Sequence, residues 1–362
     1  MAQYDVAAIS RLFEITADVR EFGPYGHGLI NHTYLVTCED GSQYILQRIN
    51  DSIFRDPDAL MANFDGVCRF MTEKILADGG DPTRETLRLV PVKTGEQYYH
   101  SEEHGWWRMT HFIDGALSHD SADQDGLLYE AAYAFGRFQR RLGDYPAETL
   151  HETIKDFHNT PARYAAFEAA LAADVAGRAK NVEAEVEAIK RYKHLASAIT
   201  DKLADGSIPT RVTHNDTKLN NVLIDNETGK GVCVLDLDTV MPGSLLYDFG
   251  DSVRFAVNHT REDDPDLSQV WFDMNLYEEY VSGFLRGVGD AITPLEKEML
   301  PMSVFVLTYE LVLRFMTDYL NGDVYFKLKY PEHNLDRARA QLRLSEDALA
   351  KLDDMAKIGA KY

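Results

Sequence analysis

Residues 214 to 224 read HNDTKLNNVLI, a loop of hydrogen-bonding side chains followed directly by an apolar strand. Twenty residues after Asp216 in this loop, a second carboxylate, Asp236, follows the largely apolar run Val232–Leu235. Residues 226 to 229 read NETG, which is typical of a turn. If the two apolar runs pair around this turn as a hairpin, the loop and the second carboxylate meet at one end of it. The stretch therefore predicts a functional site.

Phosphoryl transfer to a hydroxyl requires the side chains that this stretch carries. A carboxylate must orient the attacking hydroxyl and accept its proton, and oxygen ligands must hold Mg²⁺ against the nucleotide phosphates. Asp216 suits the first task, and Asn221 and Asp236 suit the second. The alternative is that these Asp and Asn residues only cap turns, as they often do. The spacing of the whole set favours a site.

The chain changes texture near Asp114. Before it, the β-prone runs Thr33–Thr37 and Tyr44–Ile49 flank the turn-like sequence EDGS and predict a hairpin. Pro57–Ala77 has apolar residues three and four apart, which predicts a helix beside the hairpin. Further strand texture is found at Leu87–Val92, Gln97–Tyr99 and Trp106–Ile113.

After Asp114 the texture is mostly helical. Helical apolar periods cover Leu127–Leu142, Pro161–Leu203, Leu267–Gly287, Pro294–Leu320 and Leu335–Ala356. One interruption, Pro209–Asp238, carries the predicted site hairpin. We therefore expect an α+β protein of two lobes. Residues 1–114 form a small β-rich lobe that binds nucleotide, and residues 115–362 form a larger, mainly helical lobe that holds the site.

The charge balance excludes several partners. The chain has 59 acidic and 37 basic residues, which gives a formal net charge of −22 over 362 residues. Such a surface repels phosphate backbones and anionic lipids unless a basic patch overrides the net field, and the sequence shows no such patch. We therefore expect no nucleic acid or membrane partner.

The cysteines and the apolar segments indicate the compartment. Cys38, Cys68 and Cys233 are widely spaced and form no metal-binding pattern, so they read as buried hydrophobic residues in a reducing environment. The first twenty residues lack a basic start followed by an apolar run, and the most apolar stretch, Ser303–Met316, is too short to span a bilayer. We expect a cytoplasmic protein without a signal peptide.

The two-part motif resembles the aminoglycoside phosphotransferase and choline kinase superfamily, which shares the protein-kinase-like fold. The resemblance rests on His214-x-Asp216 with Asn221 five residues later, and on the strand Val234–Asp238. It implies a kinase that uses ATP and Mg²⁺, with Asp216 as the catalytic residue and Asn221 and Asp236 as metal ligands.

A later DFGD sequence resembles the metal motif of protein kinases. It begins at Asp248, which lies 32 residues after Asp216, whereas the kinase spacing is nearer to that of Asp236. We therefore expect Asp248, together with His214 and Asp238, to support the side chains that contact metal and substrate.

Over nearly the whole chain, the sequence is similar to the bacterial N-acetylhexosamine 1-kinases. The stretches that carry this likeness are Tyr44–Asn50, Arg211–Asn221, Met241–Ser244 and Gly322–Leu335. Those kinases phosphorylate the anomeric C1 hydroxyl of N-acetylglucosamine or N-acetylgalactosamine. The likeness implies that this sugar is bound by Asp216, Asp236, Arg314 and Tyr325. For Arg314 the alternative is an ion pair with Glu310 one helical turn away.

The same resemblance implies a nucleotide site in the first lobe. The sequence GHGLIN places Gly26, Gly28 and Asn31 in a phosphate loop, in which Leu29 stands where similar kinases have His. Gln47 occupies the position at which protein kinases carry a lysine, so a neutral amide replaces a cation. The adenine would bind a hinge that includes Thr110, Phe112 and Ile113. Trp106 and Trp107 read as strand packing.

Two alternatives stay open. A kinase for another small alcohol, such as choline, homoserine or a different sugar, would carry the same catalytic loop. A catalytically silent nucleotide-binding protein would explain the missing lysine, but the intact set of Asp216, Asn221 and Asp236 argues against it.

Overall fold

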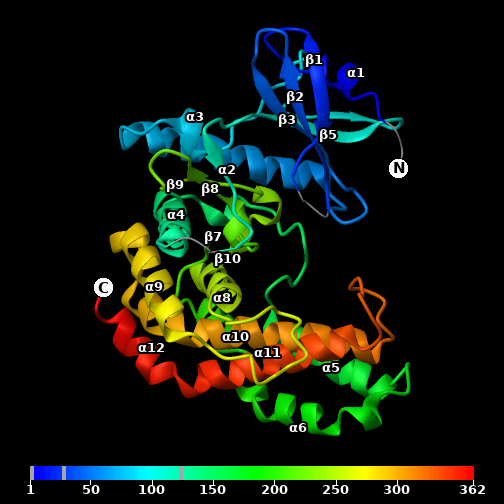
Figure 1. Ribbon diagram of the computed structural model, residues 1–362, viewed down its shortest axis with the longest axis vertical. Helices are drawn as coiled ribbons and strands as arrows, with labels where there is room; N and C mark the ends of the chain where they lie inside the picture. Colours follow the sequence, from blue (N-terminus) through cyan, green and yellow to red (C-terminus); the bar gives the residue numbers. More distant parts are fainter. Residues whose placement is uncertain (1–3, 27–29, 122–124) are drawn as a thin grey trace.

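The computed structural model describes residues 4–26, 30–121 and 125–362. An antiparallel sheet forms one lobe and helices dominate the other, with α2 between them (Figure 1). The sheet has the order β1-β2-β3-β5-β4. Its strands are β1 Val19–Pro24, β2 His32–Cys38, β3 Gln43–Arg48, β4 Tyr99–Ser101 and β5 Gly105–His111, and the short helix α1 Val6–Ser10 precedes them.

The predicted hairpin of this lobe is confirmed. Strands β2 and β3 pair antiparallel with Val36 opposite Tyr44, and Gly41 in the connecting turn has a φ of 86°. Val36, Tyr44 and Leu46 are buried in a core that also contains Val6 of α1. The sheet therefore has a hydrophobic core of its own.

Helix α2, Pro57–Ala77, has the predicted bounds. Asp56 caps it by accepting a hydrogen bond from the Ala59 amide at 3.0 Å, and proline occupies its first turn. Most of its buried face, including Phe64 and Val67, belongs to the core of the helical lobe, whereas Leu60 and Met61 near its start share a small cluster with Ile49 just after β3. The side chain of Asn63 donates to the carbonyl oxygens of His151 at 2.8 Å and Val240 at 2.9 Å, which ties α2 to that lobe.

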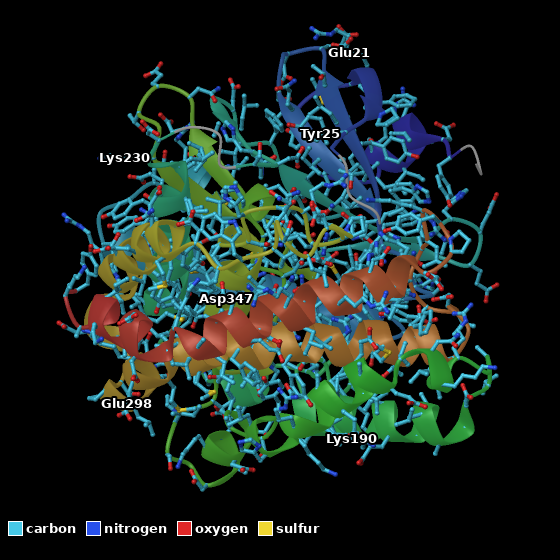
Figure 2. All side chains as sticks on the ribbon, turned by 60° about the horizontal axis from the view of Figure 1, so that its bottom comes forward. Glu21, Tyr25, Lys190, Lys230, Glu298 and Asp347 are labelled. Atoms are coloured by element: carbon cyan, nitrogen blue, oxygen red, sulfur yellow. The ribbon has the colours of Figure 1, made fainter. Side chains whose placement is uncertain are left out.

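The helical lobe packs around α10. Its helices are α4 Leu127–Arg141, α5 Thr160–Ala173, α6 Glu183–Arg191, α7 Thr200–Ala204, α8 Leu245–Ala256, α9 Met274–Val288, α10 Pro294–Leu320, α11 His333–Ala350 and α12 Leu352–Gly359; the short α3, Pro82–Glu85, follows α2. Helix α10 is long and apolar enough to cross a membrane by length and composition, but 83% of that window is buried inside the protein. Charged side chains such as Glu21, Lys190 and Glu298 project outward (Figure 2).

Helices α4 and α9 cross at glycines. A Cβ atom on Gly136 would lie 2.3 Å from the Phe284 carbonyl oxygen, and one on Gly283 would lie 2.3 Å from the Tyr129 carbonyl oxygen. Any side chain at either position would push the two backbones apart. The close crossing therefore depends on the absence of these Cβ atoms.

Two small sheets carry the site. Strands β6 Ala116–Leu117, β8 Val222–Asp225 and β9 Gly231–Val234 form one, and β7 Arg211–Thr213 pairs with β10 Met241–Gly243 in the other. Short 3₁₀ helices lie between these elements at Ala147–Thr149, Ala179–Asn181, Lys193–Leu195, Leu219–Asn221, Leu237–Thr239 and Gly289–Ala291. The cysteines are buried, as predicted.

Several predicted boundaries are wrong. The predicted helical segment Pro161–Leu203 is divided into α5, α6 and α7. Helix α5 ends because Asp174 adopts a left-handed conformation and its side chain accepts hydrogen bonds from the Arg178 and Ala179 amides. The period Leu267–Gly287 starts late, since Asp273 caps α9. The last period, Leu335–Ala356, is interrupted at Lys351 between α11 and α12.

The strand predictions also need two corrections. Leu87–Val92 makes only isolated bridges, from Leu89 to Thr110 and from Val92 to Phe13. The strand expected to run from Val232 to Asp238 ends at Val234, because Asp236 turns the chain with a φ of 57°.

Candidate active site

The site hairpin forms as predicted. In it, β8 pairs with β9 so that Val222 lies opposite Val234, and the Leu235 amide donates to the Asn221 carbonyl oxygen at 2.7 Å. This bond continues the ladder past the end of β9. It brings Asn221 and the turn at Asp236 to the same end of the hairpin.

Asp216 is held by its neighbours in the loop. The Asn221 amide nitrogen donates to the Asp216 backbone oxygen at 2.7 Å and to its carboxylate Oδ2 at 3.2 Å. Lys218 Nζ lies 2.5 Å from the other carboxylate oxygen, Oδ1. Burial opposes the charge on Lys218, but the carboxylates of Asp216, Asp251 and Asp236 together raise its pKa. No role is predicted for Lys218 from the sequence, although its position in the loop beside Asp216 could have indicated one.

His214 joins the loop to the segment that follows β9. The buried ring places Nε2 2.7 Å from the Leu235 carbonyl oxygen, and Nδ1 accepts a hydrogen bond from the Asp216 amide at 3.2 Å. Because a carbonyl oxygen only accepts and an amide only donates, these partners assign a neutral ring with the proton on Nε2. Phe135 and Phe138 pack edge-on against the ring.

Asp248 fixes the loop from the first turn of α8. Its carboxylate accepts hydrogen bonds from the His214 amide at 2.9 Å, the Asn215 amide at 2.8 Å and the Gln139 side chain at 2.6 Å. Asn215 adopts a left-handed conformation with a φ of 67°, so the loop turns sharply here. Burial raises the pKa of Asp248, and these donors oppose the rise. The Asp248 carboxylate therefore supports the loop through its backbone amides.

The residues fit a divalent cation shared with phosphate. Solvent reaches Asp236, but protein atoms crowd its carboxylate, and this desolvation together with the charges of Asp238 and Asp216 raises its pKa to about 6. The Asn221 amide nitrogen faces Asp216, which leaves the amide oxygen for a ligand. Within the described ranges, no three His, Cys, Asp or Glu side chains are grouped to hold a metal. Mg²⁺ typically takes one or two such protein ligands and completes its shell with phosphates and water.

Asp238 joins the turn after β9 to the sheet of the N-terminal lobe. It is only 4% exposed and forms an ion pair with Arg108 of β5, which is 1% exposed. The Asn31 side chain donates to the second carboxylate oxygen of Asp238 at 2.5 Å. Arg108 also donates through Nε and a terminal nitrogen to the Gln47 amide oxygen, at 3.0 and 2.9 Å. Sequence reasoning missed Arg108, which no motif marked.

The nucleotide residues are placed as follows. Asn31 bonds to Asp238 across the lobe interface, Gln47 donates to Thr33 of the neighbouring strand β2, and Gly26 has a φ of 73° in the loop after β1. Gly28, with its neighbour Leu29, lies outside the described residues. Of the expected hinge residues, Thr110 is buried within β5, Ile113 is buried just after it, and the Phe112 amide donates to the Gln43 carbonyl oxygen at 3.1 Å.

Aromatic rings pack against β5 and the residues after it. The Tyr25 ring meets the Phe112 ring edge-on with centroids 5.8 Å apart. Trp107 is fully buried in the sheet and Trp106 stacks on His100, so both tryptophans pack the strand as predicted.

Arg314 does not pair with Glu310. The Glu310 carboxylate accepts from Thr160 at 2.8 Å and bonds His158 Nδ1 at 2.9 Å, so the ion pair considered for Arg314 is wrong. The Arg314 guanidinium lies 5.6 Å from the centre of the Phe326 ring. Tyr325 is 74% exposed, and its amide is held by Asp318 at 2.8 Å.

A second arginine lies beside Arg314. Burial, and then the charge of Arg314, lowers the pKa of Arg163 in α5. The Nε of Arg163 is buried without a hydrogen-bond partner among the described residues. A buried donor of this kind is costly unless a ligand satisfies it. The two arginines therefore mark a place for a polar acceptor.

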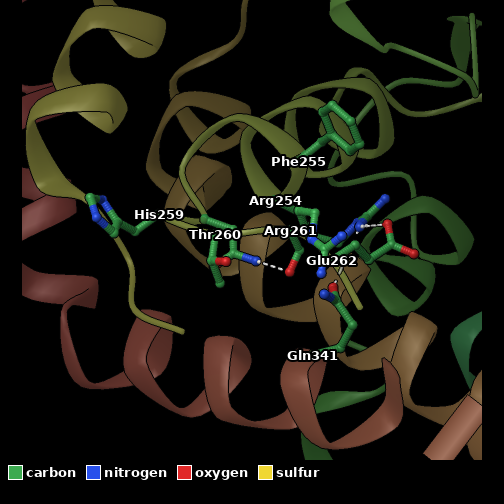
Figure 3. Close-up of a pocket in the computed structure, with 8 residues that line it drawn as sticks. Arg254, Phe255, His259, Thr260, Arg261, Glu262 and Gln341 are labelled. Atoms are coloured by element: carbon green, nitrogen blue, oxygen red, sulfur yellow. Dashed lines mark hydrogen bonds and ion pairs between the residues drawn. The ribbon is translucent and has the colours of Figure 1, made fainter. Parts of the chain in front are cut away.

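Two cavities lie in the helical lobe. One of about 390 Å³ is lined by Asn215 of the loop after β7, His158 and Tyr247 among others. The other, of about 410 Å³, lies at the end of α8 (Figure 3). In this cavity the Arg254 guanidinium is already bonded to the carboxylates of Asp251 and Glu262. We therefore assign no chemistry to this cavity.

Comparison with known proteins agrees with this geometry. The sequence model described as the phosphotransferase enzyme family matches residues 21–286. Three solved structures are similar over nearly all of both chains. They are an aminoglycoside phosphotransferase from Alicyclobacillus acidocaldarius (13% identity, 100% and 98% of the two chains, TM-score 0.64), a microcompartment-associated aminopropanol kinase (16%, 96% and 96%, 0.58) and a spectinomycin phosphotransferase in complex with ADP and spectinomycin (14%, 92% and 94%, 0.57). These likenesses confirm the expected α+β, protein-kinase-like fold.

Proposed function

The chain belongs to the phosphotransferase enzyme family, and from that premise we propose that it transfers the γ-phosphoryl group of ATP to the anomeric C1 hydroxyl of an N-acetylhexosamine, giving the sugar 1-phosphate. The contact between Asn221 and Asp216, next to the turn at Asp236, carries the proposal. The proposal includes a cytoplasmic location and a lobe boundary near Asp114.

The catalytic loop supports a direct transfer. Asp216 orients the sugar hydroxyl and takes its proton as the oxygen attacks the γ-phosphorus, while the bond from that phosphorus to the bridging oxygen of ADP breaks. Asn221 and Lys218 hold the Asp216 carboxylate in place. Lys218 also brings positive charge to the side of the loop where phosphate charge develops.

Asn221 and Asp236 would hold Mg²⁺ through an amide oxygen and a carboxylate oxygen. The bound ion supplies neutralisation of the phosphate charge. The acidic surroundings that raise the pKa of Asp236 fit this role, because a cation removes the repulsion among neighbouring carboxylates. A catalytically silent nucleotide-binding protein would not require this cluster of carboxylates.

The acceptor would lie between the catalytic loop and the two arginines. Arg314 comes from α10, Arg163 from α5 and Tyr325 from the segment after α10. The guanidinium donors suit the hydroxyl and N-acetyl oxygens of the sugar, and Phe326 offers an apolar face beside them. We propose that Arg314 and Tyr325 bind the sugar.

The decisive experiment is an acceptor panel. The purified protein is mixed with ATP and Mg²⁺, and ADP release is measured with N-acetylgalactosamine, N-acetylglucosamine, galactose, choline and homoserine. ADP release that needs an N-acetylhexosamine supports the proposal, and a phosphate on C1 in the product spectrum completes it. Turnover confined to another alcohol, or none at all with any acceptor, contradicts it.

A second candidate acceptor is a small hydroxy acid. Arg163 lies beside Arg314, its Nε has no hydrogen-bond partner among the described residues, and the nearby Glu310 carboxylate is already bonded to Thr160 and His158. This arrangement favours an anionic group at this place, and homoserine carries one. Turnover of homoserine in the same panel, with none for the sugars, would select this candidate.

A further inference from the structure

Arg108 lies at the centre of the lobe interface. Strands β3 and β5 pair so that Gln47 is directly opposite Arg108, and the two side chains share one face of the sheet. The guanidinium lies 4.3 Å from the centre of the Phe64 ring of α2. Among the residues that the structure describes, its only carboxylate partner is Asp238. A fully buried charge is tolerated only when it is paired in this way.

Asp238 belongs to the metal-binding segment. It lies two residues after Asp236, inside the 3₁₀ turn Leu237–Thr239, so its position constrains the backbone that presents the Asp236 carboxylate. A second contact from the N-terminal lobe, the Asn31 side chain, reaches the same carboxylate. Asn31 also accepts a hydrogen bond from the Asn50 amide at 3.0 Å, just beyond β3. The sheet therefore reaches the metal-binding segment through two side chains.

This arrangement explains the neutral residue on β3. Protein kinases place a lysine there, which pairs with a glutamate of the neighbouring helix. Here α2 presents an aromatic ring, and the Gln47 amide oxygen accepts two hydrogen bonds from the arginine opposite. A lysine at position 47 would put a second cation against the Arg108 guanidinium. The sheet does carry a cation at this place, the Arg108 guanidinium, but it comes from β5 instead of β3.

We propose that Arg108 is a positioning residue for phosphoryl transfer. It takes the place of the lysine of β3 as the cation of the sheet, and it pairs with Asp238 in place of a helix glutamate. Through that ion pair it fixes the turn that carries Asp236 and holds the two lobes in register. The inference rests on the proposed function only in taking Asp236 as a ligand of the nucleotide-bound cation.

The test measures binding of ADP at increasing Mg²⁺ concentration by titration calorimetry, without any sugar. In Arg108→Gln the side chain keeps an amide donor but loses its charge. The Mg²⁺ concentration that supports half-maximal ADP binding should rise about 10- to 100-fold, as is usual when a residue supporting a metal ligand is removed. The rate constant kcat should fall, and the KM for the acceptor should stay within about threefold, because the acceptor groups are not touched.

The matched control is Arg211→Gln. Arg211 forms an equally buried pair with Glu296, with Nε 2.6 Å from Oε1, but it contacts no metal-binding residue. Both variants should lower the melting temperature, whereas only Arg108→Gln should change the Mg²⁺ requirement. Equal Mg²⁺ requirements in the two variants would show that Arg108 is merely structural and would overturn the inference.

A charge relocation keeps the test decisive even if Arg108→Gln folds poorly. Gln47→Lys alone should raise the Mg²⁺ requirement and lower stability, because it sets two cations together. Gln47→Lys combined with Arg108→Gln should recover at least part of both, since it returns one cation to the same place from β3. Additive damage in the double variant would contradict the inference. Failure of the wild-type protein to bind ADP at any Mg²⁺ concentration would instead contradict the proposed function.

Discussion

His214 Nε2 lies 2.7 Å from the carbonyl oxygen of Leu235, the residue just before Asp236. On its other side Nδ1 of the same ring accepts a hydrogen bond from the Asp216 amide. One buried neutral imidazole thus sets the separation between the residue that would take the proton and a residue that would hold the cation. The two halves of the site cannot move independently while this ring stays in place.

Replacement of Asp216 should remove catalysis and spare binding. In Asp216→Asn the loop keeps its shape, because an amide oxygen can still accept from Asn221, but no group can take the acceptor proton. We expect kcat to fall by about 10²–10⁴-fold, the usual contribution of a general base. The Kd for ADP with Mg²⁺ should change less than threefold (about 0.6 kcal/mol). Unchanged kcat would refute the assignment of Asp216.

Replacement of Asp248 should disturb the loop without touching the substrates. The carboxylate accepts from two loop amides and from Gln139, and Asp248→Asn leaves one acceptor oxygen for these donors. A buried donor left unsatisfied costs about 1–3 kcal/mol. Thermal unfolding should therefore shift to lower temperature, and kcat should fall with it. Wild-type values for both would mean that the loop does not depend on this carboxylate.

Asp236→Asn should stabilise the protein in the absence of divalent cations, in a pH-dependent way. The folded-state pKa of Asp236 is raised to about 6, above the value of about 3.9 for an unperturbed Asp. A raised carboxyl pKa means that stability is lost as pH rises from about 4 through 6, where the folded protein must hold a charge that the unfolded chain holds more easily. The variant should melt above the wild type at pH 7.5 and together with it below pH 4.

Thermal scans from pH 4 to pH 8 in EDTA test this, and Mg²⁺ with ADP should then raise the melting temperature of the wild type only. A melting difference that does not vary with pH would mean that Asp236 is not under electrostatic stress.

Gly283→Ala should destabilise the crossing of α4 and α9. The new Cβ would lie 2.3 Å from the Tyr129 carbonyl oxygen, and overpacking of this kind costs about 1–3 kcal/mol, although alanine is the better helix former. The control is Gly359→Ala in α12, where a Cβ meets nothing within 4 Å. Denaturant unfolding should show a loss for the first and none for the second. Equal stability would mean that the two helices can separate without cost.

Arg163→Met should weaken acceptor binding. The change removes the unpartnered Nε and keeps much of the apolar stem, so the KM for the acceptor should rise about tenfold or more, while the KM for ATP stays the same. Steady-state kinetics with each substrate varied in turn measure both. A rise in the KM for ATP alone would place Arg163 outside the acceptor site.

The sequence predicted those elements in which the residue types and their spacing both indicate the same local structure. Both α2 and α10 have the predicted bounds because a cap and an early proline start each one. The hairpin that joins Asn221 to Asp236 was predictable because the turn and its flanking strands are adjacent in the chain. Contacts between distant parts of the chain were not predictable. Helix α8 follows the short strand β10, which was not expected, and Glu310 pairs with Thr160 rather than with Arg314, which is nearer in the sequence.

Arg108 shows why the rest of the site was out of reach. In sequence it stands between Trp107 and Met109 in a strand that also carries Thr110 and His111, and nothing near it indicates a partner. Its meaning depends on the pairing of β3 with β5 and on a carboxylate 130 residues later, Asp238. Such a contact exists only once both lobes are assembled.

Helix α2 has a mechanical consequence. It precedes β5 in the chain, yet Phe64 and Val67 are packed into the helical lobe and Asn63 anchors it there, while Leu60 and Met61 share a cluster with Ile49 just after β3. A tilt of the sheet would therefore strain contacts of α2 on both sides, including the contact between Phe64 and the Arg108 guanidinium. The helix resists relative movement of the two lobes because it is packed against both.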